Sequence, residues 1–168
     1  DNLGDDFLYV LNNAYYDNDG ILETEEDQLH GTSYYDAGIL EIGYALHDGI
    51  NSSTCTSINA ACLLYQAGNK NINENDILYT NGAYYDAGEL ETGTNIVHGT
   101  KLYTNGIFDA SSGNNYRHSN GIYYDNGIQE NSYELHTGAQ YNTCTAINNS
   151  CDLYKDGIKN TNENDILF

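Results

Sequence analysis

Closely spaced glycine turns are the feature that most limits how this chain can fold. They recur about every 6 to 12 residues and leave segments of about 4 to 6 residues, the usual length of a β-strand. In residues 75–99, the segments LYT, AYYD and ELETG are joined by Asn81-Gly82 and Ala87-Gly88. Asn-Gly favours a type I′ turn, because both central residues of that turn need positive φ. This stretch is therefore predicted to be a small β-meander.

The tyrosine-pair signature of this stretch occurs four times. Copies begin at Tyr15, Tyr34, Tyr84 and Tyr123, and each is followed by a short acidic strand and then by a histidine close to a glycine. LYTNG, another strand-and-turn signature, occurs at Leu78 and Leu102, with variants at Leu63 and Asp152. Repetition explains four equivalent histidines, His30, His47, His98 and His136, without any chemistry of their own. The alternative is a column of stacked histidines that acidification would charge.

An internal duplication organises most of the chain. Residues 54–78 match residues 143–167 at a constant offset of 89 residues without a gap. We interpret 1–75 as repeat one, 76–164 as repeat two with an inserted hairpin at about 100–120, and 165–168 as the start of a further repeat. Repeats of this kind bury their apolar faces partly against their neighbours, which favours arrays and fibres.

These patterns predict an all-β fold. The only candidate helix, residues 57–65, is too short to be stable on its own. We expect tandem hairpins or meanders in two duplicated repeats, arranged as a β-sandwich or a solenoid-like stack and pinned by disulfides. Because the sequence begins at Asp1 and contains no Met, we expect it to be a mature product or part of a longer chain.

The four cysteines share one spacing. Cys55 and Cys62 are separated by six residues, and so are Cys144 and Cys151. Four cysteines allow three pairings, and the duplication favours one bridge within each repeat, with a bridge between repeats or subunits as the alternative. Structural zinc sites usually have shorter Cys spacings. Disulfides would place the protein in an oxidising, extracellular setting.

The tyrosine pairs allow two interpretations. Adjacent strand residues point to opposite faces, so the second ring of each pair lies in a cross-strand aromatic ladder or forms an exposed face that stacks on sugars or on a neighbouring subunit. The rings concerned are Tyr16, Tyr35, Tyr85 and Tyr124.

The charge excludes several classes of partner. With 25 acidic residues against 5 Lys and Arg, the net charge is −20, which would repel nucleic acids and anionic lipids. No apolar run reaches the roughly 18 residues of a membrane span, and no signal peptide is evident, so membrane insertion is not expected. Calcium is the one cofactor left open. Asp17, Asp19 and Glu26 occupy three positions of a calcium loop, but Tyr15 occupies its first position.

Catalytic motifs are missing from the sequence. It contains no GxSxG, HExxH or Walker loop, and its many acids single out no carboxylate pair. We do not expect an enzyme.

One stretch resembles known repeat modules. ACLLYQAGNKNINENDILYTNGAYYDAG (61–88), with a near copy at 150–168, resembles Tyr/Gly/Asn-rich β-repeat modules of secreted bacterial surface and appendage proteins and of phage fibre proteins. This resemblance implies extracellular all-β modules that act as spacers, adhesins or fibre building blocks, and it carries over no functional residues.

The expected function is structural. We expect a self-assembling building block of an extracellular filament, surface appendage or fibre, whose main partners are copies of itself. The alternative is a glycan-binding adhesin module that calcium assists. The two alternatives differ in whether the second tyrosine of each pair is buried against protein or lines an open groove.

Overall fold

The structure is a computed structural model that describes residues 7–9, 13–16, 20–50, 55–141, 144, 149–162 and 167, with only the backbone described for 7–9. It divides into two compact units, Asp1–Glu91 and Thr92–Phe168, each of which is considered by itself. In the described residues, the only regular element that is not a β-strand is one 3-10 turn, η1 (Ala110–Ser112). The predicted all-β class is confirmed, and the candidate helix at 57–65 is loop followed by the start of a strand.

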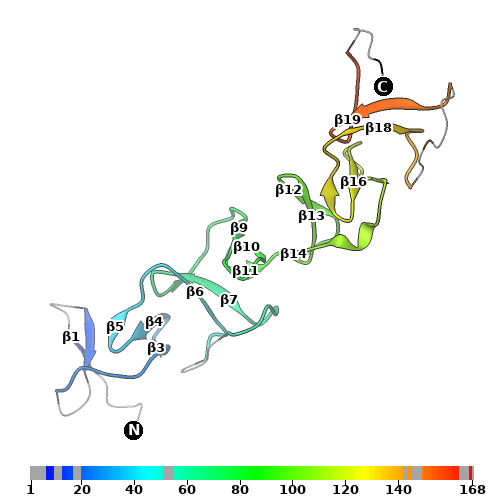
Figure 1. Ribbon diagram of the computed structural model, residues 1–168. Coiled ribbons are helices and arrows are strands. Elements are labelled where there is room, and N and C mark those ends of the chain that lie inside the picture. Colours follow the sequence, from blue (N-terminus) through cyan, green and yellow to red (C-terminus); the bar gives the residue numbers. More distant parts are fainter. Residues whose placement is uncertain are drawn as a thin grey trace. The chain divides into compact units, whose positions relative to one another are not determined.

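The described residues form seven antiparallel meanders in chain order (Figure 1). In each meander, a leading strand pairs with a middle strand, and the middle strand continues through a tight turn into a third strand. The first unit holds four meanders: β1 (Phe7–Tyr9) and β2 (Ala14–Tyr16), completed by a bridge from Tyr16 to Leu22; β3 (Gln28–His30), β4 (Ser33–Asp36) and β5 (Ile39–Leu40); β6 (Tyr44–His47), β7 (Leu63–Gln66) and β8 (Asn69–Lys70); and β9 (Ile77–Leu78), β10 (Tyr84–Asp86) and β11 (Glu89–Leu90).

The second unit holds the remaining three meanders. They are β12 (Ile96–His98), β13 (Lys101–Thr104) and β14 (Ile107–Phe108); β15 (Tyr116–Arg117), β16 (Tyr123–Asp125) and β17 (Ile128–Gln129); and β18 (Tyr133–His136), β19 (Asp152–Lys155) and β20 (Ile158–Lys159). No helix in the described ranges is long and apolar enough to cross a bilayer.

The second and third strands of each meander form a nine-residue hairpin, whose positions we number 1 to 9. In the second meander, position 1 is Ser33 and position 9 is Glu41, and only the first meander is one residue longer. In all seven, the position 9 amide donates to the position 2 carbonyl at 2.9 to 3.2 Å. These bonds run from Glu23 to Tyr15, Glu41 to Tyr34, Asn71 to Leu64, Glu91 to Tyr84, Asp109 to Leu102, Glu130 to Tyr123 and Asn160 to Leu153.

Six of these hairpins turn through two residues that both have positive φ, at positions 5 and 6. The pairs are Ala37-Gly38, Ala67-Gly68, Ala87-Gly88, Asn105-Gly106, Asn126-Gly127 and Asp156-Gly157. Such backbone angles are those of a type I′ turn, whose twist matches the twist of the flanking strands. The turn expected at Ala87-Gly88 is therefore present.

The turn at Asn81-Gly82 differs from the expected type. Gly82 has φ of +86°, but Asn81 does not have positive φ. The Asn81 carboxamide oxygen accepts the Ala83 amide at 3.0 Å, and the Gly82 amide donates to the Tyr79 carbonyl at 2.9 Å. The prediction of a type I′ turn was wrong, because the Asn81 side chain stabilises a wider turn in which only the glycine is left-handed.

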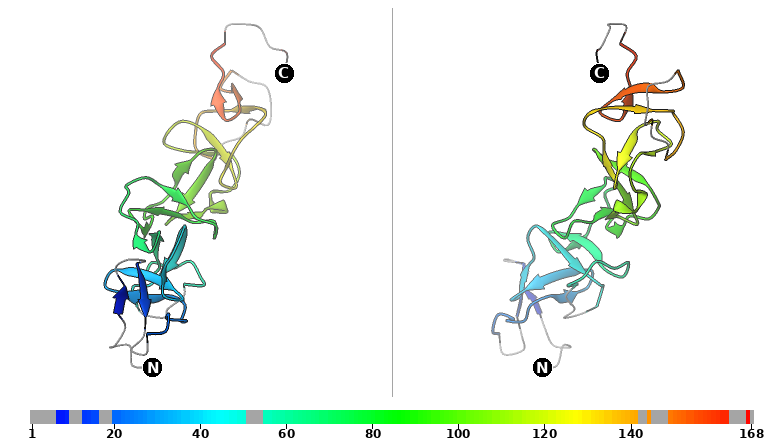
Figure 2. Two further views of the ribbon diagram at one scale, coloured as in Figure 1. Left: turned by 90° about the vertical axis from the view of Figure 1, so that its left-hand side faces the viewer. Right: turned by 45° about the vertical axis from the view of Figure 1, so that its right-hand side comes forward.

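Within each unit, a hairpin docks on the meander that precedes it. The carbonyl of the position 6 glycine accepts the position 2 amide of the preceding hairpin at 2.7 to 2.9 Å. Five such bonds lie within the units: Tyr15 to Gly38, Tyr34 to Gly68, Leu64 to Gly88, Leu102 to Gly127 and Tyr123 to Gly157. Within each unit, neighbours in sequence are therefore neighbours in space (Figure 2), as in the solenoid-like alternative.

Glycine is required at position 6 for a second reason. A Cβ on Gly38 would lie 2.6 Å from the Tyr15 carbonyl oxygen, and one on Gly157 would lie 2.5 Å from that of Tyr123. A Cβ on Gly88 would meet the Asn71 carbonyl oxygen in the same way. The turn approaches the preceding meander so closely that no side chain fits between them.

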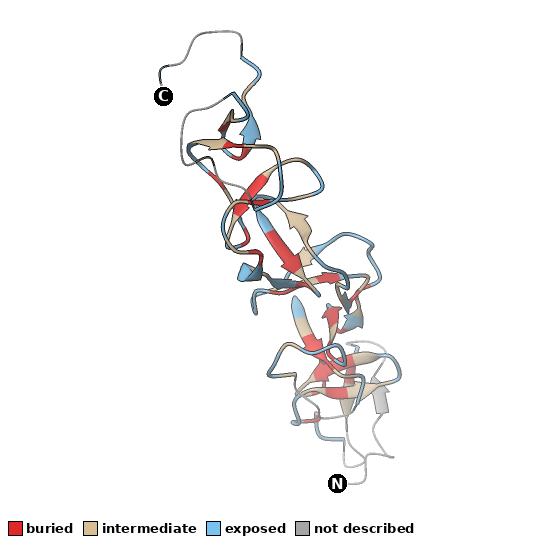
Figure 3. Ribbon diagram, turned by 90° about the vertical axis from the view of Figure 1, so that its right-hand side faces the viewer, coloured by how far each residue is buried: buried red, intermediate tan, exposed pale blue. Residues whose placement is uncertain are grey.

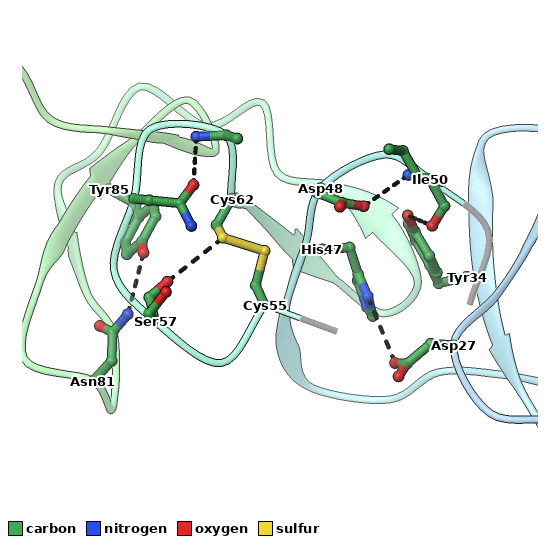
Figure 4. Close-up of a disulfide and its surroundings, with 12 residues drawn as sticks. Asp27, Tyr34, His47, Asp48, Ile50, Cys55, Ser57, Cys62, Asn81 and Tyr85 are labelled. Atoms are coloured by element: carbon green, nitrogen blue, oxygen red, sulfur yellow. Dashed lines mark hydrogen bonds and ion pairs between the residues drawn. A yellow bond between two sulfur atoms is a disulfide. The ribbon is translucent and has the colours of Figure 1, made fainter. Parts of the chain in front are cut away.

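Both predicted disulfides are confirmed. Cys55 pairs with Cys62 and Cys144 with Cys151, each across a sequence separation of 7 residues. Each bridge lies between the leading and middle strands of its meander, where the connection is longest. Figure 4 shows the Cys55–Cys62 bridge. Closing a loop of this size stabilises the fold by about 2 kcal/mol in the chain-entropy account.

The core is divided among the places where meanders meet. One cluster contains Leu46, Leu64, Ala83 and Tyr85, and another contains Leu102, Tyr116 and Tyr124. Figure 3 shows buried residues concentrated on the strands. Position 7 of the hairpin, by contrast, points outward, as at Ile158, which is 52% exposed. Stability therefore depends on successive docking rather than on one central core.

Replacing Gly88 with Ala should destabilise the first unit far more than replacing Gly82. Both glycines have positive φ, which costs an Ala about 1 to 2 kcal/mol. Only at Gly88 does the new Cβ collide with a neighbouring backbone, whereas nothing lies within 4 Å of a Cβ on Gly82. We expect a loss of roughly 3 kcal/mol or more for Gly88→Ala and about 1 kcal/mol for Gly82→Ala, measured by urea unfolding. Equal losses would show that hairpin docking contributes little.

Candidate functional site at the hairpin junctions

The hairpin junctions bring together several of the tyrosine, histidine and glutamate side chains of the protein. A junction is the contact between one meander and the hairpin of the next. Within the units, three junctions are built on a tyrosine at position 2, namely Tyr15, Tyr34 and Tyr123. Two are built on a leucine, Leu64 and Leu102. We call them tyrosine junctions and leucine junctions.

In each tyrosine junction, a histidine from the next meander lies flat on the tyrosine ring. His30, His47 and His136 are the last residues of β3, β6 and β18. Their ring centroids lie 3.7, 3.6 and 3.7 Å from those of Tyr15, Tyr34 and Tyr123, with interplanar angles of 11°, 9° and 9°. These equivalent histidines therefore share one structural role.

A second tyrosine from the next meander completes the aromatic cluster. This residue occupies position 3 and meets the first tyrosine edge-on, a favourable geometry for aromatic pairs. The centroid distances are 4.7 Å for Tyr15 and Tyr35, 4.9 Å for Tyr34 and Tyr65, and 4.9 Å for Tyr123 and Tyr154.

A buried glutamate at position 9 hydrogen-bonds to the stacked histidine. The Nε2 atoms of His30, His47 and His136 lie 2.8, 2.9 and 2.9 Å from carboxylate oxygens of Glu23, Glu41 and Glu130. These glutamates are 6%, 7% and 5% exposed, and His47 and His136 are almost completely buried. Because the position 9 amide is bonded to the position 2 carbonyl, the hairpin backbone fixes each glutamate beside its tyrosine.

Burial changes the ionisation of these groups. It raises the pKa of the Glu41 and Glu130 carboxyls, and the hydrogen bonds from His47 and His136 oppose that rise only in part. Burial also raises the pKa of the Tyr34 hydroxyl to about 12. Tyr34 donates that hydroxyl to the Ile50 carbonyl at 2.9 Å (Figure 4).

Two of the tyrosine junctions carry a further acid. Asp27 Oδ1 lies 3.6 Å from His47 Nδ1 (Figure 4), and Glu134 lies with Glu130 and His136 in the other junction. Each set of three could offer one ligand atom per residue to a metal ion. The Nδ1 atoms of both histidines are buried without a hydrogen-bond partner. Histidine and carboxylates are ligands that suit divalent transition metals, so these two sets are where such an ion could bind.

The leucine junctions lack the histidine–glutamate pair: neither has the glutamate, and the one histidine among them, His118 at the Leu102 junction, bonds to a backbone carbonyl instead. Leu64 and Leu102 are fully buried at position 2, and position 9 is Asn71 or Asp109. Asp109 instead accepts hydrogen bonds from Ser111 and Thr104, which lower the pKa of its carboxyl. Leucine junctions are therefore apolar, whereas tyrosine junctions enclose a polar pair.

Positions 2 and 9 vary together within the chain. Tyr at position 2 accompanies Glu at position 9 in four hairpins, and Leu accompanies Asn or Asp in three. The sequence interpretation noted the copied histidines but missed their pairing with glutamate. The spacing could have revealed it, since Glu41 and Glu130 both come seven residues after the first tyrosine and six before the histidine.

The second tyrosines of the pairs are mostly buried. Tyr35, Tyr85 and Tyr124 are 6%, 0% and 0% exposed, and Tyr16 is partly buried. Tyr34 and Tyr123, the first members of their pairs, are also fully buried. Both faces of the middle strand are covered, because position 2 meets the next meander and position 3 meets the preceding one.

The remaining predicted residues are not gathered into one site by the described structure. Glu26 is exposed, and the negative charge of Asp36 is the main cause that raises the pKa of its carboxyl. Asp17 and Asp19, the other calcium candidates, lie outside the described residues. His98 meets Tyr103 edge-on at 5.4 Å, and the His118 ring bonds to the Asn95 carbonyl at 2.9 Å.

No protein-family model, curated protein or solved structure matches this chain, so a functional proposal depends on the junction geometry itself.

Replacing Glu41 and Glu130 with Gln should flatten the pH dependence of stability. A carboxyl whose pKa is raised by folding contributes stability below its unfolded pKa of 4.5 and loses it as the pH rises through the folded pKa. Asp27 and Asp36 raise the pKa of Glu41 further, as Glu134 and Asp125 do for Glu130. We expect the urea midpoint of the wild type to rise between pH 7 and 5, and to rise less in the double variant.

Glu74→Gln is the matched control, because Glu74 is exposed and takes part in no junction. It removes one carboxylate, as each of the single variants Glu41→Gln and Glu130→Gln does, and should keep the pH slope of the wild type. Identical slopes in all three proteins would show that the buried glutamates contribute nothing specific.

Proposed function

We propose that this chain is a structural building block of an extracellular fibre, filament or surface appendage. The single observation that carries the proposal is the hairpin junction, which recurs five times within the units with the same glycine-to-amide hydrogen bond. A docking interaction that repeats from one module to the next is how array proteins gain length without a single large core.

The burial of the tyrosine, histidine and glutamate side chains in the junctions supports a structural function. The tyrosine, histidine and glutamate side chains of the tyrosine junctions, which would bind a ligand in an open site, are enclosed between meanders. A histidine with less than 2% of its surface exposed, such as His47 or His136, is in contact with protein rather than with solvent. The chemistry of these residues contributes to docking.

Burial of the second tyrosines weighs against the glycan-binding alternative. Sugar-binding aromatic rings need an open face, whereas Tyr35, Tyr85 and Tyr124 are nearly or completely buried. The two disulfides fit an oxidising, extracellular setting. A net charge of −20 would also oppose lateral association of such modules, because like charges repel. It would therefore limit association to specific contacts.

Electron microscopy of the purified protein, with and without a metal chelator, tests this proposal. We expect filaments whose axial repeat corresponds to one chain and which survive the chelator, because the hydrogen bonds and apolar contacts of a junction form between protein groups without an ion. Filaments that dissolve only in the chelator would make a cation part of the assembly. Dispersed monomers that bind glycans saturably would contradict the proposal and favour an adhesin.

A further inference from the structure

His47 has a buried ring nitrogen that makes no hydrogen bond. Its other nitrogen, Nε2, lies 2.9 and 3.0 Å from the two carboxylate oxygens of Glu41. Because a carboxylate only accepts, the hydrogen of the neutral ring lies on Nε2, and Nδ1 keeps its lone pair. That lone pair has no hydrogen-bond partner among the described residues, although His47 is only 1% exposed. Buried polar atoms are usually paired, so Nδ1 is suited to receive a ligand.

Asp27 of the preceding meander faces this lone pair. Its Oδ1 lies 3.6 Å from His47 Nδ1, which is too long for a hydrogen bond (Figure 4). Two zinc–ligand bonds of about 2.1 Å at a tetrahedral angle would put the two ligand atoms about 3.4 Å apart. The observed separation therefore suits a metal ion between the two atoms better than a hydrogen bond. The Asp27 side chain is 21% exposed, so an ion can reach it from solvent.

The acidic groups around Asp27 also favour a cation. The Asp36 carboxylate accepts the Asp27 amide at 3.0 Å. Burial raises the pKa of the Asp27 carboxyl, the charge of His47 opposes the rise, and the charge of Asp36 adds to it. Asp36 is also the main cause that raises the pKa of the neighbouring Glu26 carboxyl. Carboxylates that act on one another in this way repel, and a divalent cation would relieve the repulsion.

The tyrosine junction that contains His136 provides a comparison within the chain. Asn115 occupies the place of Asp27 in that junction, directly before the leading strand, with φ of +56° against +54°. The Asn115 amide donates to the Asp125 carboxylate at 2.6 Å, as the Asp27 amide donates to Asp36. The stacked histidine and its glutamate are therefore repeated there, but the acid that faces Nδ1 of His47 is replaced by an uncharged amide.

We propose that His47 Nδ1 and the Asp27 carboxylate bind one divalent transition-metal ion, of which zinc fits best, and that Glu41 orients the imidazole ring. Metal-binding histidines commonly donate their other ring N–H to a carboxylate, as His47 does to Glu41. Zinc accepts nitrogen and oxygen ligands together, whereas calcium prefers oxygen alone. Water completes the coordination from the exposed side of Asp27.

Such an ion would join the second and third meanders through their side chains. It would act in addition to the backbone bond from the Tyr34 amide to the Gly68 carbonyl, which forms without it. The inference goes beyond the proposed fibre function and does not depend on it, because binding of zinc by one chain requires no assembly.

Nitrogen NMR of the histidine rings tests the site in the intact wild-type protein, which is first treated with a chelator and then titrated with zinc. Long-range proton–nitrogen correlations distinguish Nδ1 from Nε2 in each ring. We expect the Nδ1 signal of His47 to shift and to saturate, while Nε2 keeps its hydrogen. His136 is the internal reference, and its Nδ1 should need at least about tenfold more free zinc, because Asn115 replaces the acid.

Asp27→Asn is the matching variant, since Asn is the residue found at the equivalent place, Asn115. It should weaken zinc binding, measured by titration calorimetry, at least about tenfold. In the absence of metal its urea midpoint should be no lower than that of the wild type, because the exchange removes a carboxylate that Asp36 crowds. Asp86→Asn is the control. It makes the same exchange at an exposed residue of the fourth meander and should bind zinc like the wild type.

Several outcomes would overturn the site. These are no saturable shift of the His47 ring, a shift of its Nε2 in place of Nδ1, equal shifts of His47 and His136 at each zinc concentration, or equal zinc affinity in Asp27→Asn and Asp86→Asn. Calcium that displaces zinc from His47 at equal concentration would also overturn it, because calcium prefers oxygen ligands. The ring signals of the wild type decide the question even where Asp27→Asn does not fold.

The fibre function is tested separately by the same proteins. Zinc binding that is lost in Asp27→Asn, together with filaments in both proteins, would support the site and leave the structural function standing. Zinc binding at His47 without filaments in any of the proteins would support the site and contradict the structural function.

Discussion

The rest of the structure depends on one hydrogen bond, from the position 2 amide of a hairpin to the turn glycine of the next. This bond uses the amide of the second residue of a hairpin, in a strand of only three or four residues, that would otherwise remain unpaired, and buried unpaired amides are costly. The bond needs a carbonyl at the tip of a tight turn, and it needs a residue without Cβ at that tip. At Gly68, for example, a Cβ would lie 2.7 Å from the Tyr34 carbonyl oxygen. The spacing of glycine in the sequence follows from that requirement.

A polar pair in the tyrosine junction has a different purpose from the apolar packing around it. Replacing the Glu41–His47 pair with apolar residues could stabilise the fold as well or better, because burying charged groups costs solvation energy. What the pair adds is selectivity. A glutamate such as Glu41 that met an apolar meander would be left buried without a partner, and the penalty for an unpaired buried carboxylate is larger than the gain from a formed hydrogen bond.

Sequence reasoning succeeded where the cause is local. Ala87-Gly88 could be placed because two adjacent residues determine a type I′ turn, and the pairing of Cys55 with Cys62 followed from a duplicated spacing. The type I′ turn predicted at Asn81-Gly82 was wrong because the side chain of Asn81 accepts a hydrogen bond within its own turn. The stacking of His47 on Tyr34 was missed because it joins successive meanders, and no strand or turn pattern reports which ring covers which.

Two kinds of junction also specify the order of the meanders. Tyr15, Tyr34 and Tyr123 each receive a meander whose histidine stacks on the tyrosine ring. Leu64 receives a meander without a histidine, and Leu102 receives one whose His118 bonds to the Asn95 carbonyl instead. A hairpin in the wrong place would leave a histidine without its glutamate or a glutamate without its histidine. A tyrosine junction therefore favours a meander that carries the histidine, which helps a chain of repeated hairpins to keep its register.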